Sequence, residues 1–133
     1  MATIFTRIVK GEIPAYKVAE DDNYLAFLDV NPLTKGHTLV IPKKEVDYIF
    51  DLEDSDYLGL FFFARKVAAA VEKSVSCLRI GIAVVGLEVP HAHIHLVPLH
   101  HMGDIDFNKT RVKLTPEEFK ALAETISSNF KAS

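Results

Sequence analysis

The chain has 133 residues, of which 49% are hydrophobic and 25% are charged, and its formal net charge is −3. These values are typical of one globular domain with a single apolar core. The small negative charge gives no general attraction to nucleic acid or to an anionic membrane, so any phosphate binding must be local. One cysteine, Cys77, excludes an internal disulfide framework and a C-x-x-C metal clip, and it indicates a reducing compartment.

Neither a signal peptide nor a membrane-spanning segment is expected. The first residues, MATIFTRIVKGEIPAYK, mix charged and apolar side chains and lack the continuous apolar stretch of a leader. The apolar run LGLFFFA, residues 58–64, is far shorter than a span requires. We therefore expect a cytoplasmic protein that forms one domain over residues 1–133.

The first part of the chain predicts a short helix followed by three strands. Apolar residues recur at helical spacing within residues 4–9, before a glycine and a proline that end the helix. Residues 16–21 and 23–30 favour two strands joined by a tight turn, and residues 37–42, HTLVIP, favour a third strand.

The second part predicts a long helix over residues 54–74, two strands within residues 77–87 and 91–99, and a last helix that Thr115 caps and that runs to Asn129. The apolar face expected for the long helix consists of Leu58, Phe61, Phe62, Ala64, Val67, Ala68 and Val71. Five strands joined mostly by hairpins and two main helices predict an α+β fold with a five-stranded antiparallel sheet.

Three of the six histidines stand at alternate positions in the segment VPHAHIHLVPL, residues 89–99. In a strand, alternate side chains share one face, so His91, His93 and His95 are expected to form a row. The residues between and after them, Ala92, Ile94 and Leu96, are expected to point to the opposite face, toward a core.

Three interpretations of this row are open. The histidines can form the polar face of an amphipathic strand. Two of them, His91 and His93, can bind a metal ion, as in a metal-dependent hydrolase. The third interpretation is nucleophilic or acid–base catalysis, because a neutral imidazole whose far nitrogen donates a hydrogen bond can attack phosphorus.

The segment HAHIHLV resembles the His-φ-His-φ-His-φ-φ motif of the histidine-triad (HIT) superfamily of nucleotide hydrolases and transferases. IFTRIVKGEIPA, EDDNYLAFLDVNPLTKGHTLVIPKK and GLEVPHAHIHLVP also follow the order and spacing of that family. The similarity is to its small nucleoside phosphoramidase-like (Hint-type) branch. It implies a single HIT domain, a homodimer whose sheet continues across the interface, and hydrolysis of a purine nucleotide derivative at the α-phosphate.

The resemblance also implies roles for individual residues. The middle histidine, His93, would attack the α-phosphorus and form a nucleotidyl-histidine intermediate; His91 would orient it, and His95 would contact phosphate oxygens and assist proton transfer. Asp29 would accept both ribose hydroxyls. The base would lie in an apolar slot made of Phe5, Ile8, Phe27 and Val30, and the phosphate would meet backbone N–H groups in the segment with Gly86, Glu88 and Val89. The segment from Leu99 to Phe107 is expected to influence substrate choice.

The sequence departs from the pattern of that family in ways that motivate an alternative. A Gly-Gln pair usually precedes the triad, whereas this chain has Gly86-Leu87, and Glu88 stands where relatives often carry a small hydroxyl residue. These changes favour, as the alternative, a regulatory protein that binds a nucleotide or a partner with little turnover. The C-x-x-C pair and the histidine that bind structural zinc in some relatives are missing, with Glu45 at the position of that histidine, so no metal or cofactor is expected.

Overall fold

The computed structural model describes residues 2–131, which form three helices, five strands and two 3₁₀ turns. In chain order the elements are α1 (Ile4–Val9), β1 (Lys17–Glu20), β2 (Tyr24–Leu28), β3 (Thr38–Pro42), η1 (Ile49–Asp51), α2 (Asp54–Ser74), β4 (Arg79–Ala83), β5 (Ile94–Leu99), η2 (Met102–Ile105) and α3 (Pro116–Asn129). None of the helices within residues 2–131 has the length and apolarity that a membrane span needs.

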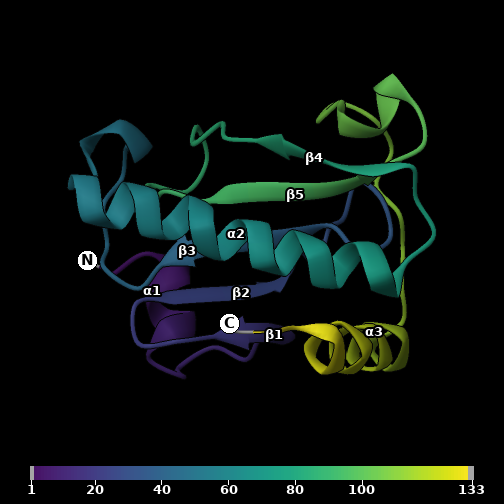
Figure 1. Ribbon diagram of the computed structural model, residues 1–133, viewed down its shortest axis with the longest axis horizontal. Coiled ribbons are helices and arrows are strands. Elements are labelled where there is room, and N and C mark those ends of the chain that lie inside the picture. The colour runs from purple at the N-terminus through teal and green to yellow at the C-terminus, as the bar shows by residue number, and fades with distance from the viewer. Residues whose placement is uncertain (1, 132–133) are drawn as a thin grey trace.

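The strands form a single sheet in the order β1-β2-β3-β5-β4, and every neighbouring pair is antiparallel. The predicted α+β fold with a five-stranded antiparallel sheet is therefore confirmed. Helix α2 crosses one face of the sheet, and α1 lies behind the opposite face (Figure 1). Because α2 carries the chain from β3 to β4, β5 can insert between these two strands.

The face of the sheet under α2 is the larger apolar core. Side chains at alternate strand positions, including Ala26, Val40, Ile94 and Leu96, pack there against the buried side of α2. Helix α3 joins this core beside β1, and it begins with the expected capping box, in which Thr115 and Glu118 each accept the backbone N–H of the other. The predicted bounds of α2 and α3 are confirmed.

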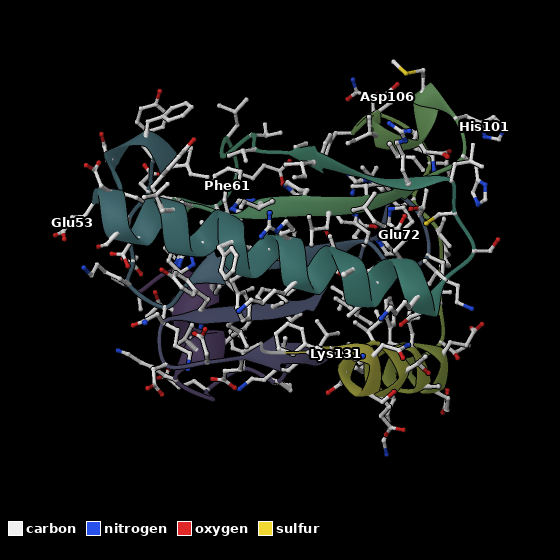
Figure 2. The ribbon with its side chains drawn as sticks, viewed as in Figure 1. Glu53, Phe61, Glu72, His101, Asp106 and Lys131 are labelled. Carbon is white, nitrogen blue, oxygen red and sulfur yellow. The ribbon has the colours of Figure 1, made fainter. Side chains whose placement is uncertain are left out.

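The predicted apolar face of α2 is partly wrong. The helix buries Leu60, Phe63, Ala64, Val67, Ala70 and Val71. Two residues assigned to the buried face, Leu58 and Phe62, are 67% and 52% exposed. Apolar residues cover more than one side of this helix, so the sequence periodicity does not single out the side that meets the sheet. Figure 2 shows the length of this helix between Glu53 and Glu72.

The opposite face of the sheet carries a smaller core. Its buried members are Phe5, Ile8, Leu25, Phe27, Leu39 and Ile41. Helix α1 covers this core, and Thr3 caps the helix by accepting the Thr6 N–H. All four buried histidines, His37, His91, His93 and His95, belong to positions that alternate with residues of the larger core, so they face the α1 side.

The triad strand is shorter than predicted, because β5 begins at Ile94 and includes only His95 of the three histidines. The backbone of the preceding residues bonds elsewhere: the Ala92 N–H donates to the Val46 carbonyl, and the His91 carbonyl accepts the His93 ring. The inward and outward alternation nevertheless holds through residues 91–96. The predicted opposite placement of the histidines and of Ala92, Ile94 and Leu96 is thus observed.

Candidate active site

A cavity of about 500 Å³ lies on the α1 face of the sheet. Its walls come from α1, the end of β2, the loop before the triad, the triad itself and the segment after η2. The cavity brings together ten of the eleven predicted site residues: Phe5, Ile8, Phe27, Asp29, Val30, Gly86, Glu88, Val89, His93 and His95. His91 lies behind this wall and is fully buried.

His93 lines the cavity, and the backbone engages one of its two ring nitrogens. Its Nδ1 lies 2.7 Å from the His91 carbonyl oxygen. Because a carbonyl only accepts, Nδ1 must carry the proton of the neutral ring, and Nε2 keeps a free lone pair. The Phe5 ring packs edge-on against the imidazole, with centroids 5.0 Å apart. A lone pair held in this way can act as a nucleophile or as a base.

His91 has both ring nitrogens engaged within the protein. Nε2 donates to the Pro42 carbonyl oxygen at 2.8 Å, and Nδ1 accepts from the Thr3 hydroxyl at 3.0 Å. Burial lowers the pKa of His91, which keeps the ring neutral. Since neither nitrogen is available, His91 and His93 do not fit a shared metal ion. The contact of His91 with His93 is made by its backbone carbonyl, not by its ring.

His95 is paired with a fourth histidine. His37 Nε2 lies 2.9 Å from His95 Nδ1, and His37 Nδ1 accepts the Leu33 backbone N–H at 3.0 Å. Burial is the main cause that lowers the pKa of each ring to about 3. Phe107 packs edge-on against His95, with centroids 4.8 Å apart. These two histidines are therefore neutral near pH 7.

The two carboxylate oxygens of Asp29 lie in different surroundings. One oxygen, Oδ1, accepts the Asn31 N–H at 2.8 Å and forms a turn after β2. The other oxygen, Oδ2, lies 3.6 Å from His37 Nε2, and the residue lines the cavity. The carboxylate is thus fixed by the backbone on one side and keeps acceptor capacity on the side of the cavity.

Asp29, His37 and His95 form the one cluster of possible metal ligands found within residues 2–131, with ligand atoms within 4.8 Å of one another. The hydrogen bonds of His37 do not suit a metal. A neutral imidazole that coordinates through Nε2 carries its proton on Nδ1, and that nitrogen then donates to a second-shell acceptor. In this protein Nδ1 of His37 instead accepts an N–H group, so Nε2 holds the proton.

The loop before the triad offers backbone donors. The N–H groups of residues 86–89 donate to no protein acceptor within residues 2–131, and Gly86 adopts a positive φ of 74°. Glu88 is exposed at this rim. Lys43 and Lys44 do not line the cavity; they pair with Glu20 and Asp56.

Sequence reasoning missed several residues of the site. His37 precedes β3 and shares the face of Leu39, which pairs with His95, so the strand register was the signal that could have revealed it. Asn108 and Arg111 follow η2 and also line the cavity, and Arg111 donates to the backbone carbonyls of Asn31 and Phe107. His101 and Asp106 flank η2 (upper right in Figure 2) and do not line the cavity.

The fold and the site define an α+β protein whose pocket is built on buried, hydrogen-bonded histidines. The profile of the HIT domain matches residues 10–102. The chain is 36% identical over 133 residues to adenosine 5′-monophosphoramidase hnt1 of Schizosaccharomyces pombe, which covers 98% of this chain and 100% of that protein. It is 37% identical over 106 residues to Protein hit of Bacillus subtilis, covering 76% of this chain and 73% of that protein.

The comparison of structures agrees with the comparison of sequences. The crystal structure of a Hit-like protein involved in cell-cycle regulation from Bartonella henselae matches with a TM-score of 0.83 at 28% identity, covering 96% of each chain. This chain belongs to the HIT family, as the resemblance of its sequence implied.

Proposed function

We propose that this protein is a nucleotide hydrolase that acts at the α-phosphate of a purine nucleoside phosphoramidate or a related nucleotidyl conjugate. The observation that carries the proposal is the tautomer of His93: Nδ1 donates to the His91 carbonyl, and the lone pair of Nε2 is left for attack. The sequence similarity to an adenosine 5′-monophosphoramidase over nearly the whole chain favours this substrate class.

The walls of the cavity suit the parts of a nucleotide. Phe5, Ile8, Phe27 and Val30 offer apolar surface for a base. Asp29 Oδ2 can accept the ribose hydroxyls, since an ionised carboxylate makes strong hydrogen bonds. The backbone N–H groups of residues 86–89 are donors for phosphate oxygens.

The reaction proceeds in two displacements. His93 Nε2 attacks phosphorus, the new N–P bond forms, and the bond from phosphorus to the leaving group breaks with its electron pair on that group, which takes a proton from water. The ring then bears a positive charge, and the His91 carbonyl that accepts from Nδ1 stabilises it. Water attacks phosphorus in the second step, the N–P electron pair returns to Nε2, and a nucleoside monophosphate is released together with a proton, which neutralises the hydroxide left in the first step.

Calorimetry with AMP and GMP, followed by turnover of an adenosine phosphoramidate, tests this proposal in wild type and His93→Ala. We expect both proteins to bind AMP, and we expect the variant to lose at least about 10³-fold in turnover, because the nucleophile is gone. An exposed histidine outside the cavity, His101, provides the matched control His101→Ala. Equal turnover by wild type and His93→Ala would refute the mechanism; AMP binding without turnover by wild type would favour the regulatory alternative.

We also propose that two copies associate through β4. This strand ends the sheet and pairs only with β5 within residues 2–131, so one edge of its backbone is unpaired. The exposed apolar side chains of Ile82, Leu58 and Phe62 lie on β4 and α2. Light scattering at micromolar concentration is expected to give the mass of a dimer, and Ile82→Lys is expected to shift it toward the monomer. A monomer mass for wild type would reject this proposal.

A further inference from the structure

Arg111 is the one lysine or arginine that lines the cavity within residues 2–131. Two carboxylates, those of Asp29 and Glu88, line the same cavity. His95 supplies no positive charge near pH 7, because burial lowers its pKa to about 3. A nucleotide adds the negative charge of its phosphate to a cavity that already holds two acids. Arg111 is therefore the side chain placed to offset that charge.

The guanidinium of Arg111 is held by the backbone of two segments. Its Nη1 donates to the Asn31 carbonyl oxygen at 2.8 Å, and its Nη2 donates to the Phe107 carbonyl oxygen at 3.1 Å. The Cζ atom lies 5.8 Å from the centroid of the Phe107 ring. The chain that follows is also fixed, since the Val112 N–H donates to the Pro32 carbonyl oxygen at 2.9 Å. The side chain thus has a defined position before a ligand binds, which lowers the entropic cost of binding.

These contacts leave donor capacity on the guanidinium. Such a group carries more N–H donors than the two carbonyls occupy. Arg111 makes no ion pair among residues 2–131. Asp29 lies close to Asn31 in the chain, but its Oδ2 faces His37 Nε2 at 3.6 Å. An arginine with unused donors suits an anion, and its planar fork matches the oxygens of a phosphate.

The charge of Arg111 reaches the end of the cavity that holds the histidines. Phe107, whose carbonyl accepts from the guanidinium, packs edge-on against His95, with ring centroids 4.8 Å apart. Burial is the main cause of the lowered pKa of His37 and of His95, and the positive charge of Arg111 lowers both pKa values further. The guanidinium therefore lies within electrostatic range of the place proposed for the phosphate.

We propose that Arg111 binds the phosphate of the nucleotide and offsets its negative charge. The match to the HIT profile ends at residue 102, so it assigns no role to Arg111. That the anion is a nucleotide phosphate rests on the function proposed above. The presence of an anion site rests only on the contacts of Arg111 within the protein.

Calorimetry with AMP and with adenosine separates phosphate binding from support of the cavity wall, because adenosine has the same base and ribose but no phosphate. In Arg111→Gln, which removes the charge and keeps an amide donor, we expect the Kd of AMP to rise about 10-fold to 100-fold, since a charge-assisted hydrogen bond is lost. We expect the Kd of adenosine to change by less than about twofold. The affinity of wild type for AMP is expected to fall more steeply with salt than that of Arg111→Gln.

Lys109 provides the matched control for the loss of one positive charge. Its Nζ donates to the Leu33 carbonyl and so links the same two segments, but Lys109 does not line the cavity. We expect Lys109→Gln to leave the Kd of AMP within about twofold of the wild-type value. In Arg111→Lys the charge remains without the planar fork, so we expect an AMP affinity between those of wild type and Arg111→Gln.

Equal losses of AMP and adenosine affinity in Arg111→Gln would overturn the proposal, because they would show that Arg111 only supports the cavity wall. An unchanged Kd of AMP in that variant would contradict it as well. If wild type binds no AMP, the function proposed above fails, and inorganic phosphate becomes the probe, with the NMR resonance of the Arg111 Nε–H group in wild type as the readout. A shift that sodium chloride at equal ionic strength does not produce would support the anion site, and the absence of such a shift would refute it.

Discussion

The two faces of the sheet bury side chains for different reasons. Under α2 the sheet buries almost only apolar groups, and shape and area hold that layer together. Under α1 it buries four histidines beside aromatic rings, and each histidine is fixed by one or two hydrogen bonds. Satisfied polar groups in a low-dielectric interior specify one arrangement, since a misplaced partner is costly. We infer that the core under α2 supplies most of the folding free energy, and that the residues under α1 carry the proposed reaction.

A matched pair of phenylalanines gives the largest test of this contrast. Phe119 lies in the larger core and Phe5 in the cavity wall, and both are 7% exposed. Phe119 stacks on Tyr16, whereas Phe5 contacts the rings of Phe27, His91 and His93. We expect Phe119→Ala and Phe5→Ala each to lower the free energy of unfolding by about 3 kcal/mol.

Only Phe5→Ala is expected to weaken AMP binding, by about 10-fold, because it removes apolar surface from the proposed slot for the base. Urea denaturation measures stability, and calorimetry measures affinity. Equal loss of AMP affinity in both variants would show that the two faces are coupled, and the division of labour between them would be wrong.

The second prediction concerns pH. The pKa of both His37 and His95 falls from 6.5 to about 3 on folding, chiefly because the rings are buried. Between these values the unfolded chain binds protons that the native state does not, so stability is complete above about pH 6.5 and is lost as the pH falls toward 3. Each such ring contributes a slope of about 1.4 kcal/mol per pH unit within that window.

Urea denaturation at several pH values measures this slope. His37→Gln is expected to make it shallower by about one proton, and His101→Gln, which alters an exposed ring, is the control. Backbone N–H donors lower the pKa of three carboxylates, Glu45, Asp104 and Glu118. Their contributions to the free energy of unfolding are lost only below about pH 4.5, whereas the contribution of the two histidines begins to fall at about pH 6.5. A flat profile between pH 6.5 and 5 would contradict neutral burial of the pair.

The sequence predicted the architecture better than the details of the site. Caps and periodicity located α2 and α3, and the alternation of residues 91–96 located the histidine face. The buried side of α2 was not predictable, because Leu58 and Phe62 are as apolar as the residues that meet the sheet. His37 was missed because its role depends on an antiparallel neighbour 58 positions away, and a single histidine carries no periodic signal.

The smallest expected effect tests the hydrogen bonds that join α1 to the segment after β3. Glu45 Oε1 accepts the Thr3 N–H at 2.9 Å and the Thr6 hydroxyl at 2.6 Å, and Thr3 in turn donates to His91. The carboxylate thus links α1, which carries Phe5, to the segment after β3. In Glu45→Gln the acceptor loses its charge but keeps its shape, so we expect the KM of the phosphoramidate to rise by no more than about fivefold, with kcat unchanged.

Hydrogen exchange of the α1 amides is expected to accelerate in Glu45→Gln, since the helix is short and depends on its contacts. Glu12→Gln is the matched control. Glu12 follows α1 and is an exposed carboxylate that pairs with Arg7 of that helix, but it does not contact the threonines that bond His91. A fall in kcat in Glu45→Gln would mean that the threonine contacts of His91 control the nucleophile as well as the slot, and the face under α1 would then act as one unit from Glu45 to His93. An unchanged KM together with faster exchange would instead show that α1 can loosen without disturbing the slot for the base.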